Sequence, residues 1–145
     1  MQIPKYFTLK EMTATSLPIE NSPETWTELS NLRDTALQLD RIREKFKKGI
    51  RVTSGYRSVD VNTAVGGSRT SAHRKGLAAD IQPWKNTKAN MKELANICRK
   101  MATSLSTAVD QVIIYTVDGK DTDNIMWIHI AFSDKPRHQL LFKKG

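Results

Sequence analysis

The spacing of apolar residues along the chain predicts two amphipathic helices. In the first, apolar residues recur three and four positions apart, which indicates a helix of about 22 residues with one buried face. Its apolar positions are Trp26, Leu29, Leu32, Ala36, Leu39, Ile42 and Phe46. Ser22 and Pro23 are typical of a helix start, and Gly49 of a helix end. The second helix is predicted to begin at Asn86 or Thr87 and to run to about Thr103.

Between and after the helices, the pattern changes to that of short strands. The predicted strands are 50–54, 77–82, 111–115 and 126–132, with a hairpin connection over 116–124. Residues 56–72 are rich in Gly, Ser and Thr and predict a loop. The expected fold is therefore α+β, with a small, mostly antiparallel sheet packed against two main helices. The length of 145 residues fits one domain, over 1–145.

Composition narrows the class of protein without deciding its chemistry. The chain is 39% hydrophobic and 26% charged, which is ordinary for a globular protein, and no segment reaches the length of a membrane span. The net charge of +8 favours acidic partners, but no nucleic-acid-binding motif is present. The single cysteine, Cys98, excludes an internal disulfide, and its helical spacing predicts a core position. No secretory signal is evident at the N-terminus, so we expect synthesis in the cytoplasm. We also expect a monomer that binds neither nucleic acid nor membrane.

Two predicted strands carry polar residues that suit a metal site. In the last strand, Met126, Ile128 and Ile130 share the core face, and Trp127 and His129 lie on the other. Asp80 interrupts an apolar strand, where a carboxylate is costly unless it is paired or bound to a cation. His73 ends the preceding loop. Two histidines and one carboxylate, with a fourth position left for water, are the pattern of a catalytic zinc site. On spacing alone, His129 could equally be an exposed or hydrogen-bonded strand histidine.

Two motifs resemble those of a known enzyme family. Ser71 to Asp80 has the form S-x-H-x-x-G-x-A-x-D, and about fifty residues later Trp127 to His129 has the form W-x-H. This pair is similar to the D-alanyl-D-alanine metallopeptidase family, which includes zinc D-Ala-D-Ala carboxypeptidases, peptidoglycan endopeptidases of phage endolysins and, more distantly, the Hedgehog signalling domain. The segments YFTLKEM, VTSGYRS, VNTAVGGS and VDQVIIY resemble the carboxypeptidase branch, so the likeness covers nearly the whole chain.

The resemblance implies a zinc peptidase that hydrolyses peptidoglycan stem peptides with a zinc-activated water. It implies Zn²⁺ on His73, Asp80 and His129, and it places Arg57 beside the substrate, where a guanidinium suits a carboxylate. Ser71 is expected to bind substrate or to steady the loop, and Asn62 and Arg69 are weaker candidates for the same cleft. The compact chain fits a phage or prophage lysin that acts on the cell wall. The alternative is a non-catalytic zinc module that binds wall peptides or a protein partner.

The general base is where the sequence departs from the family pattern. Relatives carry an acid at a position that falls here on Tyr115, or three residues before the last histidine, where this chain has Met126. We expect Asp123, six residues before His129, to be the catalytic base. Asp110 is the second candidate for the base, but we expect it rather to support the site or to pair with a basic residue. His138 is expected to be a surface residue.

Overall fold

The structure, a computed structural model, describes residues 2–145 and has the predicted α+β architecture, with a five-stranded sheet and two long helices. The strands are β1 (Ile50–Ser54), β2 (Ala78–Pro83), β3 (Val109–Thr116), β4 (Ile125–Phe132) and β5 (Gln139–Lys144). Their order in the sheet is β1-β2-β4-β3-β5. Neighbouring strands are antiparallel except β3 and β5, which are parallel.

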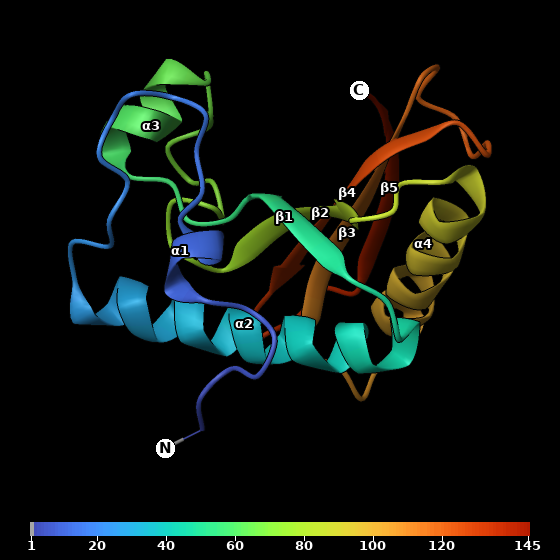
Figure 1. Cartoon of the computed structure of the whole chain (residues 1–145), viewed down its shortest axis with the longest axis horizontal. Coiled ribbons are helices and arrows are strands. Elements are labelled where there is room, and N and C mark those ends of the chain that lie inside the picture. Colours follow the sequence, from blue (N-terminus) through green and yellow to red (C-terminus); the bar gives the residue numbers. More distant parts are fainter. Residues whose placement is uncertain (1) are drawn as a thin grey trace.

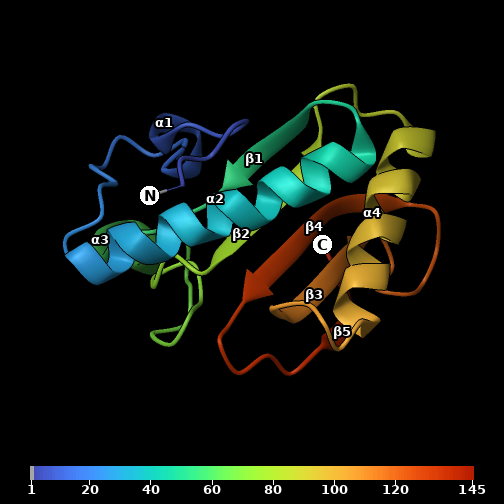
Figure 2. The ribbon, with the colours of Figure 1, turned by 90° about the horizontal axis from the view of Figure 1, so that it is seen from below.

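The two long helices, α2 (Trp26–Phe46) and α4 (Lys88–Thr103), cross the same face of the sheet (Figures 1 and 2). Their apolar faces and the inward residues of the strands form one core cluster, in which Leu39, Ile81, Ile128 and Ile130 are fully buried. Cys98 is also fully buried on α4, as predicted, and burial raises the pKa of its thiol to about 12. The side chains of Asp80 and His129 lie on the opposite face of the sheet.

Two short helices flank the end of the sheet at β1: α1 (Leu9–Met12) and α3 (Val59–Ala64). The helix α3 lies inside the segment predicted to be a loop. It forms because Ser58 caps it, with its hydroxyl accepting a hydrogen bond from the Val61 backbone N–H at 3.2 Å. In residues 2–145, no helix is both long and apolar enough to cross a membrane.

The structure corrects several predicted positions. Helix α2 starts at Trp26 rather than at Ser22, because the Thr25 hydroxyl accepts a hydrogen bond from the Glu28 N–H at 3.1 Å and caps the helix there. Trp26 was predicted to be apolar core, but it lies in the first turn and is 86% exposed. Met126 was predicted to share the core face of β4. It is 41% exposed, because the pairing with β3 shifts register between Trp127 and Ile125, and Ile125 packs against the core instead.

Candidate metal centre

Asp80 and His129 are brought together by strand pairing. In the antiparallel β2–β4 pair, Asp80 stands directly opposite His129, so both side chains leave the sheet on the same face. The neighbouring pair on that face is Ala78 opposite Ala131, and both alanines are buried. These small residues leave room above the sheet for a third side chain.

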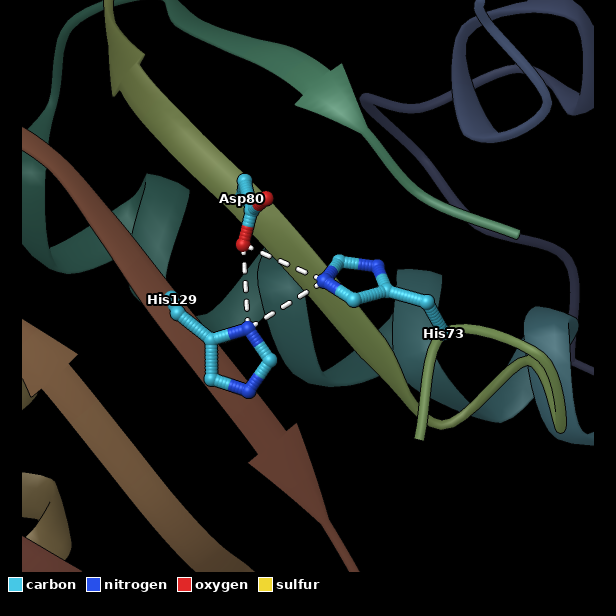
Figure 3. Close-up of side chains that lie close together, drawn as sticks. All are labelled: His73, Asp80 and His129. Atoms are coloured by element: carbon cyan, nitrogen blue, oxygen red, sulfur yellow. Dashed lines mark hydrogen bonds and ion pairs between the residues drawn. The ribbon is translucent and has the colours of Figure 1, made fainter. Parts of the chain in front are cut away.

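His73 supplies that third side chain from the loop before β2 (Figure 3). The residue is 4% exposed, and its Nδ1 lies 2.8 Å from the backbone carbonyl oxygen of Gly55. A carbonyl can only accept a hydrogen bond, so Nδ1 carries the proton and Nε2 presents its lone pair to Asp80 and His129. Such an outer hydrogen bond is the usual way to fix the tautomer of a metal-binding histidine.

Three potential ligand atoms form a nearly equilateral triangle. The His73 Nε2 lies 3.2 Å from the His129 Nδ1 and 3.2 Å from the Asp80 Oδ1, and the latter two atoms are 3.0 Å apart. Zinc bonds of about 2.0–2.1 Å in tetrahedral geometry would separate two ligand atoms by about 3.3 Å. The triangle therefore matches one face of a zinc tetrahedron, and its nitrogen, nitrogen and oxygen donors suit that ion. Among residues 2–145, these three form a group able to hold a metal ion.

Electrostatics keep the Asp80 carboxylate ionised. Burial would raise its pKa, but the close contacts with His129 and His73 outweigh burial and hold the pKa well below the usual range. The guanidinium of Arg57 adds a further positive charge, with its Nη2 3.8 Å from the Asp80 Oδ2. The carboxylate is therefore held in the charged form that a metal ligand needs.

The three residues lie at a cavity of about 540 Å³, which Arg57 and Ser71 also line. Arg57 is mostly buried, and its Nε donates a hydrogen bond to the Ser54 Oγ at 3.2 Å, which orients the guanidinium toward Asp80. The hydroxyl of Ser71 makes no hydrogen bond within residues 2–145, although its backbone is fixed by bonds to Ser68 and Arg74. Both side chains are therefore available to a ligand in the cavity.

At its other end, the cavity is lined by residues of β3 and by the segment after β4. Asp110 is bound by Arg137 through two side-chain hydrogen bonds, at 3.0 and 2.9 Å, and one backbone bond at 2.9 Å. These bonds hold the pKa of Asp110 below its usual value. The ion-pair role expected for Asp110 is therefore the one that the structure shows.

Tyr115 and Trp127 also line the cavity, and their rings stack with centroids 4.5 Å apart. They form a cross-strand pair on β3 and β4, one step along the sheet from His129. The sequence indicated the face of Trp127, but the facing residue on β3 depends on the strand register, which no local signal reveals. The Gly55 carbonyl was missed for a similar reason, because a backbone partner leaves no mark in residue type.

Asp123 is not brought to this site. Its carboxylate lies on the hairpin between β3 and β4, lines a separate hollow beside the start of α4, and is more than half exposed. Its closest charged partner there is the Nζ of Lys92, at 3.5 Å. A strand advances about 3.3 Å per residue, so the four residues from Ile125 to His129 already place the hairpin about 13 Å from the histidine. This arrangement does not support the expected role of Asp123 as base.

The weaker candidates also lie outside the lining of the cavity. Asn62 is buried, and its Nδ2 donates to the Ser68 carbonyl at 2.9 Å, so it holds the loop that Ser71 belongs to. Arg69 is exposed on that loop. His138 follows Arg137 with a positive φ of 53° and does not reach the cavity.

The close packing at Gly55 leads to a prediction about stability. A Cβ at this position would lie 2.2 Å from the backbone oxygen of Met12, so Gly55→Ala must push two backbone segments apart. We expect a loss of about 3 kcal/mol in the free energy of unfolding, the upper end of the usual cost of overpacking. Urea unfolding measures it. Gly49→Ala is the matched control, because the atoms nearest to the added Cβ belong to the exposed side chain of Trp84 and not to backbone. Equal midpoints for the two variants would contradict the prediction.

The comparisons with known proteins agree with this geometry. The model of the family described as Peptidase M15 matches residues 5–111, about three quarters of the chain. The matched part contains Arg57, His73 and Asp80, whereas His129 lies beyond it and is assigned from the W-x-H motif and from the structure. A comparison with curated proteins finds no match. The family model matches most of the chain, and the three potential ligands agree with that match. The chain therefore belongs to the peptidase M15 family.

Proposed function

We propose that the protein is a zinc metallopeptidase that hydrolyses peptide bonds of bacterial peptidoglycan stem peptides. The observation that carries the proposal is the triangle of His73, Asp80 and His129 atoms, 3.0–3.2 Å apart, beside a cavity large enough for a short peptide. Membership of a peptidase family supplies the class of reaction. The three residues would hold the zinc ion.

Zinc bound by these residues supplies Lewis acidity, which acidifies water and polarises an amide carbonyl. Hydrolysis adds water across the amide: the C–N bond breaks, the hydroxyl ends on the acyl carbon and a proton ends on the leaving amine. Arg57 binds and orients the substrate beside the reacting carbonyl, because its guanidinium is fixed by Ser54. Ser71 donates its unused hydroxyl to the substrate backbone.

The charges around the cavity support an acidic peptide as substrate. Its lining contains Arg57, Lys75 and Arg137 against the carboxylates of Asp80 and Asp110. Asp80 would be neutralised by zinc and Asp110 is neutralised by Arg137, so positive charge remains for a substrate carboxylate. Stem peptides end in such carboxylates. The proposal therefore covers a D,D-carboxypeptidase, which needs the terminal carboxylate, and an endopeptidase that cuts within the stem or cross-bridge.

One observation favours a second candidate, a non-catalytic zinc module that binds wall peptides. Among residues 2–145, the carboxylates that line the cavity are Asp80, a proposed ligand, and Asp110, which is bound by Arg137. Neither is free to act as a general base in the usual way of a metallopeptidase. Such a module would bind zinc and peptide without turnover.

Digestion of purified peptidoglycan separates these candidates. Zinc-loaded protein, chelator-treated protein and treated protein with zinc restored are incubated with the wall, and the released fragments are identified by mass. Zinc-dependent loss of a terminal D-alanine identifies a carboxypeptidase, and zinc-dependent internal cuts identify an endopeptidase. Protein that holds one zinc but releases nothing from any wall type would contradict the enzyme and favour the module.

A further inference from the structure

The hydroxyl of Tyr115 lies at the cavity, and the proposed metal chemistry gives this hydroxyl no role. It makes no hydrogen bond within residues 2–145, although Tyr115 is partly buried and lines the same cavity as the three proposed ligands. Its ring is held by stacking on Trp127, with an angle of 18° between the two planes. The ring position is thus fixed while the hydroxyl stays free for a ligand.

The position of Tyr115 on the sheet places it close to the proposed ligands. On β3, Ile113 stands opposite His129, and Tyr115 is the next residue on the same face. His129 in turn stands opposite Asp80, with Arg57 beyond it. Tyr115 and Arg57 therefore approach the metal group from opposite sides, one from the β3 side and the other from the β1 side.

The surroundings keep the phenol protonated. Burial raises the pKa of Tyr115, and the negative charge of Asp80 raises it further, against a lowering by the positive charge of Arg57. At neutral pH, the hydroxyl is therefore neutral and offers one O–H donor. A neutral phenol is a poor base, which excludes proton abstraction as its role, but it is well suited to donate a hydrogen bond to negative charge.

We propose that the Tyr115 hydroxyl donates a hydrogen bond to the oxygen of the scissile carbonyl as that oxygen becomes negative in the tetrahedral intermediate. This inference rests on the proposed hydrolysis. The proton stays on the phenol oxygen throughout, so Tyr115 contributes by stabilising charge. Donors that are already in place are effective because they need no reorganisation as charge develops.

The test removes only this hydroxyl. Tyr115→Phe keeps the ring that stacks on Trp127, and Tyr6→Phe is the matched control, because Tyr6 packs against Arg43 away from the cavity. We expect Tyr115→Phe to lower kcat on a stem peptide by about 10- to 100-fold, the range for a hydrogen bond to a charged group, with KM changed less than about threefold. Tyr6→Phe should leave both constants unchanged.

A binding measurement on the zinc-loaded proteins gives a readout that does not need turnover. The probe is a dipeptide phosphinate, in which a tetrahedral phosphorus carries the negative oxygens in place of the scissile carbonyl. By calorimetry, Tyr115→Phe should weaken phosphinate binding by the same factor as kcat, while the unreactive product peptide binds equally to both proteins.

The outcomes separate this inference from the proposed function. Weaker phosphinate binding by Tyr115→Phe in a protein that cuts no wall would overturn the enzyme proposal and leave the donor role of Tyr115 standing. Full activity of Tyr115→Phe, or equal phosphinate affinity in the two proteins, would overturn the inference while the peptidase proposal stands. Failure of the zinc-loaded wild-type protein to bind the phosphinate would overturn the inference as well.

Discussion

Asp80→Ala is expected to abolish zinc binding at micromolar concentrations and, with it, all hydrolysis. The carboxylate supplies one of three donor atoms and the only negative charge among them, 3.0 Å and 3.2 Å from the two histidine nitrogens. Loss of a group that merely supports a ligand weakens metal binding by about 10- to 100-fold, so loss of the ligand itself should cost at least about 100-fold. Competition with a chromophoric chelator measures the zinc affinity.

The control for this variant is Asp123→Asn. It removes a carboxylate that lies on the hairpin beside Lys92 and outside the cavity. We expect it to bind zinc and to cut peptidoglycan like the wild-type protein. Undiminished zinc affinity in Asp80→Ala would contradict the proposed ligand set, and loss of turnover in Asp123→Asn with zinc still bound would return the role of base to Asp123.

Arg57→Ala is expected to lower kcat/KM on stem peptides with a free terminal carboxylate by about 100-fold, within the range for hydrogen bonds to charged groups. The guanidinium is oriented by Ser54 and lies beside Asp80, where it can bind a carboxylate through two parallel hydrogen bonds. Arg57→Lys should recover only part of the loss, because an ammonium lacks the planar pair of donors.

The comparison substrate for this prediction is the same peptide with an amidated terminus. In the wild-type protein, amidation should reduce kcat/KM by about as much as Arg57→Ala does, and in Arg57→Ala it should have little further effect. Ser71→Ala is a useful second variant, because it removes a neutral donor from the same cavity and should affect both substrates alike. If Arg57→Ala still distinguished the free from the amidated peptide by the same ratio, Arg57 would not be the group that binds the carboxylate.

The parts of the fold that depend on local pattern could be predicted from the sequence. Helical spacing located α2 and α4, and alternation along β4 placed Ile128 and Ile130 in the core with His129 on the other face, as the structure confirms. Strand β5 was not predicted, because QLLFKK has no alternation and its partner is the distant strand β3. The start of α2 was misplaced because two capping sequences, at Ser22 and Thr25, compete within four residues.

The candidate site, like the fold, could be predicted from the sequence only in part. His73, Asp80 and His129 were identified by residue type and motif, and the structure brings them together. Their exact geometry depends on the pairing of Asp80 with His129 and on the Gly55 carbonyl, both of which are contacts between segments far apart in the sequence. Asp123, the expected base, lies outside the cavity for a related reason: it is close to His129 in the chain, but an extended strand carries it away.

The most direct measurement of the central claim is a zinc titration of hydrolysis. Zinc-free protein receives increasing amounts of zinc, and the rate of cleavage of a stem peptide is recorded at each step. The account predicts a rate that rises linearly, reaches a plateau at one zinc per chain and stays at zero across the titration in Asp80→Ala. Cleavage by the zinc-free protein, or a chain that takes up one zinc and still cuts no peptide, would contradict it.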